Sequence, residues 1–302
     1  MKHSFKEYFN IPTNQQVDFL NIPLDEDLKA FIRPFLIANN RQLKVSDEIF
    51  SQMKQFLEKL NRQFVMTNDK SNGIAFLSKL NEPNEYHLGY SNTNKGKAIH
   101  NVRAETIFGA LNNNKFAKQG NTITNEAHNV LLLVKGIGQD IMSDAIANVC
   151  RNILAEFTYQ QCLKHNIPTS RVQSHYYDIL TNSWKNIDFE LPYYKGKPII
   201  LIPEKIIAGG RSYSNNYNYF VAMNNIASDI LNGKIPVANE DRFINKMKDG
   251  TRKAIIKEIY KEYSKPKAEL IDFVLEYNDS LSAFLDYAKE NYPALDLSFV
   301  KD

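Results

Sequence analysis

The sequence predicts an α+β protein, with a mixed body over residues 1–212 and a helical subdomain over residues 213–302. Two observations predict this class. In several segments apolar residues recur at three- and four-residue spacing, which is typical of amphipathic helices, whereas short apolar runs bounded by turn residues indicate strands. Beyond residue 212 the helical pattern dominates, and a chain of 302 residues is long enough for one large domain or two unequal ones.

The body is predicted to pack a small β element on a central helix. The clearest helix is expected over residues 47–63, with Ser46 as its N-cap. A β-hairpin is expected over residues 74–90, because two apolar runs flank the turn-forming sequence Asn-Glu-Pro-Asn. The central helix is expected to run without interruption from Ser143 to about residue 165.

The remaining segments have weaker patterns. Residues 102–111 predict a short helix, residues 112–125 a polar loop, and residues 184–192 an irregular segment. The apolar run between Pro198 and Pro203 predicts a short strand.

Composition excludes several classes of protein. The 37 Lys and Arg residues against 34 Asp and Glu residues give a formal charge of +3, which is too small to predict a polyanionic partner by itself. No window approaches the roughly 18 apolar residues of a membrane span, so we expect no membrane association and a cytoplasmic location. Cys150 and Cys162 fall in the predicted central helix, about 18 Å apart, so they are not expected to pair.

Residues 135–144 are the most informative window for chemistry. Gly136 and Gly138 free the backbone immediately before a helix start that carries Asp140 and Asp144. Carboxylates at such a start favour a divalent cation that bridges to phosphate oxygens, and oxygen ligands favour Mg²⁺ or Mn²⁺. The alternative is structural: Asp140 or Ser143 is an ordinary N-cap, and Asp144 complements the helix dipole.

Two further residues follow the logic of a restriction-type nuclease site. The sequence departs from that pattern, because no Glu-x-Lys triplet lies on a strand here, so the acid would come from Asp144, Asp188 or Glu190. Lys205, after the predicted strand, would stabilise charge on a phosphate, while Glu190 would join the metal ligands or act in catalysis with Asp144. Glu85 or Glu126 would add a carboxylate if the predicted hairpin packs on the central helix. The alternatives are that Lys205 is a solvated strand end and that the glutamates are surface residues.

The C-terminal part offers a basic surface. Lys253, Lys257 and Lys261 recur every four residues and are predicted to share one helical face, with Arg252 beside it. Such a face would follow a phosphate backbone in a salt-dependent manner. The alternative is a solvated helix face that Glu258 and Glu262 partly neutralise.

Four blocks resemble a family of uncharacterised bacterial proteins of the kind found beside phage-defence genes. They are residues 22–37, 85–91, 136–144 (Gly-Ile-Gly-Gln-Asp-Ile-Met-Ser-Asp) and 198–205. The resemblance implies a role in antiviral defence and a protein partner from a defence operon, but no named activity. Arg33 stands where the first block of that family usually has Asp, which would remove an acidic ligand if that Asp held metal.

Two functional hypotheses follow. In the first, the protein is a Mg²⁺- or Mn²⁺-dependent nuclease, with Asp140 and Asp144 as metal ligands and Asp144, Glu190 and Lys205 in catalysis. In the second, it is a non-catalytic member of a defence complex that binds nucleic acid or a protein partner.

Overall fold

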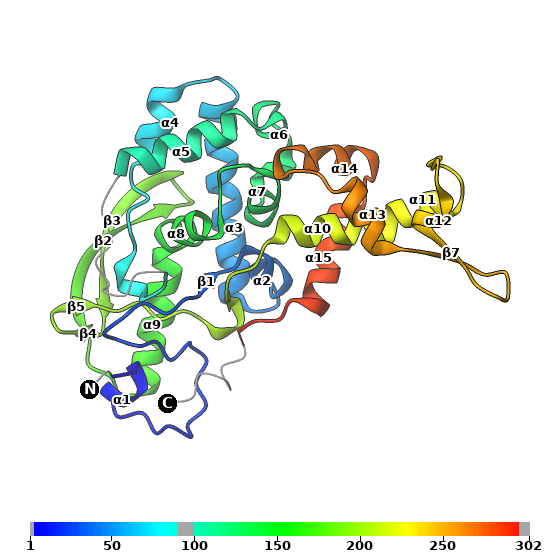
Figure 1. The fold of residues 1–302 in the computed structure, drawn as a ribbon. Helices are drawn as coiled ribbons and strands as arrows, with labels where there is room; N and C mark the ends of the chain where they lie inside the picture. The colour runs from blue at the N-terminus through cyan, green and yellow to red at the C-terminus, as the bar shows by residue number, and fades with distance from the viewer. Residues whose placement is uncertain (1–2, 90–99, 296–302) are drawn as a thin grey trace.

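The computed structural model describes residues 3–89 and 100–295 and confirms the α+β class. Figure 1 shows a wide body and a narrower projection, residues 227–263, which we call the arm. The arm contains two short helices, α11 (Ala227–Leu231) and α12 (Glu240–Phe243), and a β-hairpin, and it ends with helix α13 (Ile256–Tyr263). Within the described residues, no helix is long and apolar enough to cross a membrane.

Helix α3 (Lys44–Lys59) forms the centre of the body and confirms the predicted amphipathic helix. It continues as a π-helix over Leu60–Val65. The N-cap prediction is wrong, because the helix begins one turn earlier, after Leu43, and Ser46 lies buried inside it. The buried face consists of Ile49, Met53, Phe56, Leu57 and Leu60.

Over the described residues 74–89 the predicted hairpin is absent, and residue 90 lies outside the described part of the chain. The first half of the predicted hairpin lies in helix α4 (Lys70–Leu77), whose N-cap Asp69 accepts a hydrogen bond from the backbone amide of Asn72. Its second half begins with a short 3-10 helix, Asn84–Tyr86. The four-residue apolar run was too short to distinguish a strand from a buried helical turn.

The hairpin of the body lies about 100 residues further along. Strands β2 (Ser170–Asp178) and β3 (Ser183–Leu191) pair antiparallel over nine residues each, with Val172 opposite Phe189. Residues 184–192, which were predicted to be irregular, therefore lie almost entirely in the regular strand β3. Trp184 anchors it to α4, because its indole Nε1 donates a hydrogen bond to the Phe76 carbonyl at 2.9 Å.

The predicted central helix is two helices. Helix α8 (Gln139–Val149) and helix α9 (Arg151–Lys164) meet at Cys150, whose backbone leaves the helical conformation. The two cysteines therefore do not share one continuous helix, and both are buried free thiols. Burial raises the pKa of the Cys162 thiol to about 12.

The apolar run over residues 199–202 is buried, but only Lys197–Pro198 (β5) is paired as a strand, with Tyr193–Tyr194 (β4). The Ile200 amide donates to the Glu85 carbonyl, and the Leu20 amide donates to the Ile202 carbonyl. This segment thus joins the N-terminal residues to the chain around residue 85.

The C-terminal part is mainly helical but is interrupted by a hairpin of β7 (Ile244–Lys246) and β8 (Arg252–Ala254). Its helices return to the body, where Phe284 lies 5.7 Å from Phe35, measured between ring centroids. Besides α13, the C-terminal helices are α10 (Tyr213–Val221), α14 (Leu270–Glu276) and α15 (Ser280–Asn291). Helix α10 continues into α11 through a π-helix over Ala222–Ile226, and a 3-10 turn over Lys267–Glu269 precedes α14.

Short elements complete the body. The predicted helix at residues 102–111 is confirmed as α5 (His100–Asn112), but the predicted polar loop after it contains two short helices. The remaining elements are α1 (Phe5–Tyr8), β1 (Phe31–Ile32), α2 (Pro34–Asn39), α6 (Lys115–Lys118), α7 (Ala127–Leu133), β6 (Ile207–Ala208), which pairs with β1, and 3-10 turns over Thr122–Asn125 and Glu204–Ile206.

Candidate functional site

The glycine-containing loop turns sharply into α8. Gly136 adopts a φ of +94°, which favours glycine, and Gly138 is the N-cap residue in an extended conformation. The N-cap predictions for Asp140 and Ser143 are therefore wrong: Asp140 lies in the first turn, and Ser143 is buried further along the helix. The Ser143 hydroxyl instead accepts a hydrogen bond from the Ile32 amide at 3.0 Å, which ties α8 to β1.

Asp144 is held by an arginine from a distant helix. Its Oδ2 lies 2.5 Å from Nη1 of Arg103, and Nη2 of the same arginine lies 3.0 Å from Oε2 of Glu82. The Asp144 side chain is only 18% exposed. Burial raises its pKa to about 7, and Glu82 adds to this rise, whereas Arg103 opposes it. Arg103 therefore forms ion pairs with two carboxylates, and one of these, Asp144, is largely buried.

A third carboxylate belongs to the same neighbourhood. Burial raises the pKa of Asp27 to about 6, with a further contribution from the charge of Glu82, while Lys197 opposes it. The backbone around Asp27 is joined to residues 87–89, since the Leu28 amide donates to the His87 carbonyl. The described segments of all four sequence blocks, residues 22–37, 85–89, 136–144 and 198–205, thus lie in one part of the body, while residues 90–91 lie outside the described part of the chain.

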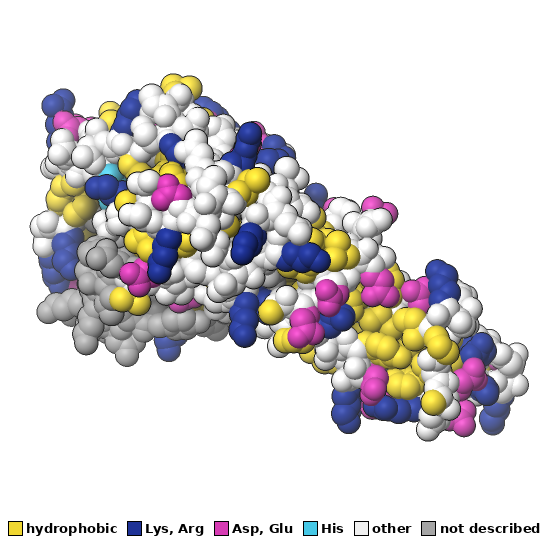
Figure 2. All heavy atoms as spheres, turned by 90° about the horizontal axis from the view of Figure 1, so that it is seen from above, with side chains coloured by type: hydrophobic (Ala, Val, Ile, Leu, Met, Phe, Trp, Pro, Cys, Tyr) yellow, Lys and Arg dark blue, Asp and Glu magenta, His cyan; other side chains and the backbone are white. Residues whose placement is uncertain are grey.

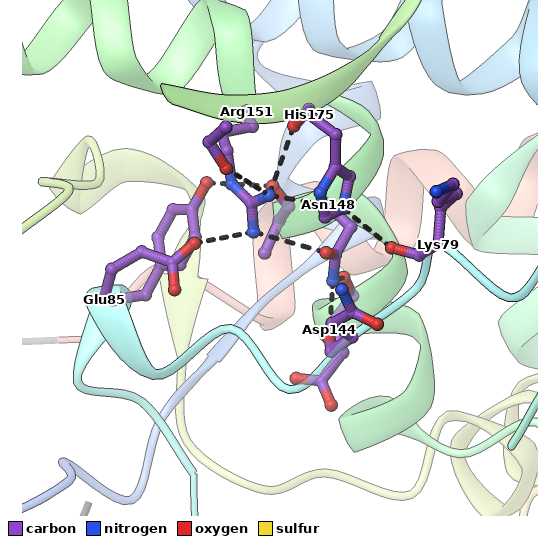
Figure 3. Close-up of polar contacts among 10 residues, drawn as sticks. Lys79, Glu85, Asp144, Asn148, Arg151 and His175 are labelled. Carbon is purple, nitrogen blue, oxygen red and sulfur yellow. Dashed lines mark hydrogen bonds and ion pairs between the residues drawn. The ribbon is translucent and has the colours of Figure 1, made fainter. Parts of the chain in front are cut away.

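Beside this cluster lies a buried polar network around Arg151 (Figure 3). Arg151 is 3% exposed, and its Nη2 lies 2.6 Å from Oε1 of Glu85 and 3.2 Å from Oδ1 of Asn148. Its Nη1 donates to Oγ of Ser174 at 3.0 Å and to the carbonyl of His175 at 3.2 Å. Figure 3 shows the Asp144 carboxylate pointing away from this guanidinium. The network therefore braces the junction between α8 and α9 against strand β2.

The structure does not bring the other predicted catalytic residues to Asp144. Glu190 lies on β3, where it pairs with Arg171 across the hairpin at 3.2 Å. Lys205 lies in a 3-10 turn and not at a strand end, and its exposed ammonium is 3.8 Å from Glu204. No hydrogen bond or ion pair in the described part of the chain joins Asp144, Glu190 and Lys205.

The metal prediction rests on Asp140 and Asp144, which lie one helical turn apart on α8. Among residues 3–89 and 100–295, no group of three or more His, Cys, Asp or Glu side chains is arranged to hold a metal ion. The two further carboxylates considered from the sequence have other partners: Glu85 pairs with Arg151, and Glu126 lies 3.4 Å from Lys54.

Residues 10–214 match a family described as a domain of unknown function, DUF8370. The chain belongs to this family. Neither a curated protein nor a solved structure matches the sequence. The DUF8370 domain contains the Asp144 cluster and the Arg151 network, whereas the arm lies beyond the matched residues.

The basic residues predicted for one helical face outside the DUF8370 domain are divided between two elements. Arg252 and Lys253 lie on strand β8, so only Lys257 and Lys261 share a face of α13. The chain cannot continue the helix back to residue 253, because it pairs with β7 there. Arg252 is also engaged, with its Nη2 3.2 Å from Oε1 of Glu240.

The arm nevertheless has an excess of unpaired positive charge. It contains eight Lys or Arg residues and six Asp or Glu residues, which is +2 of the chain's formal +3. Figure 2 shows Lys and Arg side chains at its surface among exposed hydrophobic ones. Four exposed lysines of the arm make no ion pair within the described residues: Lys248, Lys253, Lys257 and Lys261.

Two acidic residues of α13 pair with an arginine of the arm. Arg242 lies 2.7 Å from Oε2 of Glu262 and 3.8 Å from Oε2 of Glu258, so both carboxylates already have a cationic partner. The alternative expected from the sequence, a solvated face partly neutralised by Glu258 and Glu262, stays open, because one arginine cannot compensate both carboxylates.

Proposed function

We propose that the protein binds nucleic acid through the arm. The observation that carries this proposal is the pairing of Arg242 with Glu258 and Glu262, because it leaves Lys257 and Lys261 side by side without an ion pair within the described residues. Lysines four residues apart on a helix follow a phosphate backbone well, and each contact adds salt dependence through counterion release.

Location supports the same proposal. The arm projects from the body (Figure 1), so a long polymer can reach Lys257 and Lys261 without contacting the DUF8370 domain. The neighbouring hairpin adds the unpaired Lys248 and Lys253. A role in antiviral defence, with a partner protein from the same operon, remains a prediction from the resemblance of the four blocks.

The test is fluorescence anisotropy with labelled 20-nucleotide oligonucleotides over a range of salt concentrations. Wild-type protein should bind, and the doubly substituted variant Lys257→Glu/Lys261→Glu should lose at least about tenfold in affinity at low salt. The slope of log K against log salt should become shallower by roughly 1.4–1.8 as two contacts are lost. Binding should persist in the presence of EDTA.

The matched control is Lys115→Glu/Lys118→Glu on α6, which makes the same charge change at two exposed lysines of the body. Equal losses in both variants would mean that only net charge matters, and this result would overturn the proposal. Absence of wild-type binding to every oligonucleotide would overturn it as well.

Metal-dependent hydrolysis remains a prediction from the sequence. One feature of the structure favours its further testing: Asp144 and Glu82 share the guanidinium of Arg103, and burial raises the pKa of Asp144 to about 7. In the structure Arg103 pairs with both Asp144 and Glu82, so Mg²⁺ or Mn²⁺ would have to displace it. Cleavage of the same oligonucleotides with either ion, and its loss in Asp144→Ala, would establish the nuclease.

A further inference from the structure

Two tyrosines lie together at the base of the arm. Tyr219 of α10 and Tyr260 of α13 have ring centroids 5.9 Å apart, with their planes tilted by 60°. Tyr219 is 43% exposed, and Tyr260 is half-buried. The pair therefore presents aromatic surface to solvent next to the helix that carries the unpaired lysines.

The hydroxyl groups distinguish these two tyrosines from their structural neighbours. The Tyr217 hydroxyl bonds Ser280 at 2.6 Å, and the Tyr277 hydroxyl donates to Asp229 at 3.1 Å, as buried or anchoring tyrosines do. Neither Tyr219 nor Tyr260 makes a side-chain hydrogen bond anywhere in the described part of the chain. Their hydroxyls do not hold the fold together.

Helix geometry places Tyr260 beside the lysines. At about 100° per residue, Tyr260 lies roughly 60° from Lys257 around the axis of α13, on one side of the face formed by Lys257 and Lys261. Glu258 and Glu262 lie on the other side of that face, where Arg242 holds them. The lysine face is thus bordered by aromatic rings on one side and by two acids that share Arg242 on the other.

Resting on the proposed nucleic-acid binding, we infer that the arm binds single-stranded nucleic acid, with bases on Tyr219 and Tyr260 and phosphates on Lys257 and Lys261. Every base has a π face, and stacking on aromatic side chains combined with a basic track is how proteins hold single strands without sequence preference. In a duplex the bases are already stacked on each other, so the tyrosines would gain nothing from it. RNA and single-stranded DNA share this chemistry.

An acidic peptide fits the surface less well. Its carboxylates would use the lysines, but they would leave the tyrosine rings without a partner. An acidic peptide therefore accounts only for the lysines, whereas a single strand accounts for the lysines and the tyrosine rings.

The experiment compares wild type with Tyr219→Leu/Tyr260→Leu, which keeps apolar packing and net charge. The probes are a 20-nucleotide deoxythymidine strand, a 20-nucleotide uridine strand, a 20-base-pair DNA duplex and poly-aspartate as competitor. Wild type should prefer either single strand to the duplex, and the double variant should lose at least about fivefold in single-strand affinity. Its duplex affinity and its salt slope should stay unchanged, because the lysines remain.

Tyr8→Leu is the matched control, since Tyr8 is a 42% exposed tyrosine of the body; it should bind as wild type does. The variant with Tyr260→Phe should retain binding, because it keeps the ring. Thermal melts verify that the variants are folded.

Each outcome separates this inference from the proposed function. Equal affinity for single strand and duplex, or unchanged single-strand binding after loss of both rings, would overturn the inference while nucleic-acid binding stands. Displacement by poly-aspartate at equal charge concentration would overturn it in favour of an acidic protein partner. If wild type binds none of the oligonucleotides, the proposed function itself fails. If the inference is confirmed, tighter binding of the uridine strand identifies the ligand as RNA, and tighter binding of the deoxythymidine strand identifies it as single-stranded DNA.

Discussion

The guanidinium of Arg151 lies 2.6 Å from the carboxylate of Glu85, and both charges are largely removed from water. Arg151 is the first residue of α9, directly after the break at Cys150, whereas Glu85 comes from a 3-10 turn 66 positions earlier in the chain. A buried ion pair of this kind depends on both partners, because removal of one leaves the other desolvated and uncompensated.

We therefore expect Arg151→Met to lower the free energy of unfolding by about 3–5 kcal/mol, measured by urea denaturation. The double variant Arg151→Met/Glu85→Gln should recover part of this loss, since it leaves no unpaired charge. Arg171→Met, which removes an exposed partner of Glu190, is the control and should cost less than about 1 kcal/mol. A similar effect of both single substitutions would contradict the assignment.

The raised pKa of Asp144 predicts how stability depends on pH. The folded state holds this proton up to about pH 7, whereas the unfolded chain releases it near the ordinary value of 3.8. Between these values the unfolded state binds fewer protons, so Asp144 makes wild-type stability fall as pH rises from about 4 to about 7. Asp144→Asn should remove this fall, which is at most about 4 kcal/mol.

The control is Asp178, whose contribution to stability should change with pH in the opposite direction. Lys185 and Thr181 hold the pKa of Asp178 at about 2, below its unfolded value of 3.8. Asp178 therefore stabilises the fold above pH 4, and this contribution is lost as pH falls towards 2. Urea midpoints should be measured from pH 2 to pH 8. Compared with wild type, Asp144→Asn should flatten the pH dependence between about pH 4 and pH 7, and Asp178→Asn should flatten it between about pH 2 and pH 4. Parallel curves for wild type and Asp144→Asn would show that the Asp144 pKa is not raised.

Two helical glycines should respond oppositely to alanine. A Cβ at Gly73 of α4 would lie 2.4 Å from Cε2 of Phe108, a buried ring, so Gly73→Ala should cost about 1–3 kcal/mol. Gly109 of α5 has open space around its Cβ position, and Gly109→Ala should stabilise the protein by roughly 0.5–1 kcal/mol through helix propensity. Thermal melts of both variants test the packing of α4 on α5, and shifts in the same direction would refute it.

Arg242 should influence nucleic-acid binding without contacting the ligand. Arg242→Gln releases Glu258 and Glu262 next to the lysine face, so affinity at low salt should fall on the order of threefold to tenfold. The free energy of unfolding should change by less than about 1 kcal/mol, because these pairs are exposed. Arg62→Gln, which frees Glu58 on the body, removes the same charge and should leave affinity unchanged.

Secondary structure was predictable where the pattern was long and regular. Helix α3 follows from apolar spacing alone, because Ile49, Met53, Phe56 and Leu57 make one buried face. The hairpin was misplaced because the apolar run at residues 74–77 is too short to show a helical or strand period. Strand β3 was missed because its burial alternates weakly, and only the packing of Trp184 on α4 identifies its inner face.

The candidate site was predictable only in part. The glycines before α8 mark a sharp turn, and Gly136 does adopt the left-handed conformation. Arg103, Glu82 and Arg151 escaped prediction, because no local pattern distinguishes a buried arginine from an exposed one. Arg103 lies 41 residues from Asp144 in sequence, and only the packing of α5 and α8 brings their charges together.

The sequence by itself determined the fold class and the amphipathic helix α3, because helical periodicity is a local property of the chain, whereas it placed Lys253 on a helix that begins only at Ile256. Tertiary structure alone decided which charges are paired: Arg103 joins Asp144 to Glu82, and Arg242 joins Glu258 to Glu262, whereas Lys257 and Lys261 make no ion pair within the described residues. The physical reason is that the energy of a charge depends on its burial and on its nearest partners, and both are set by segments far apart in the chain.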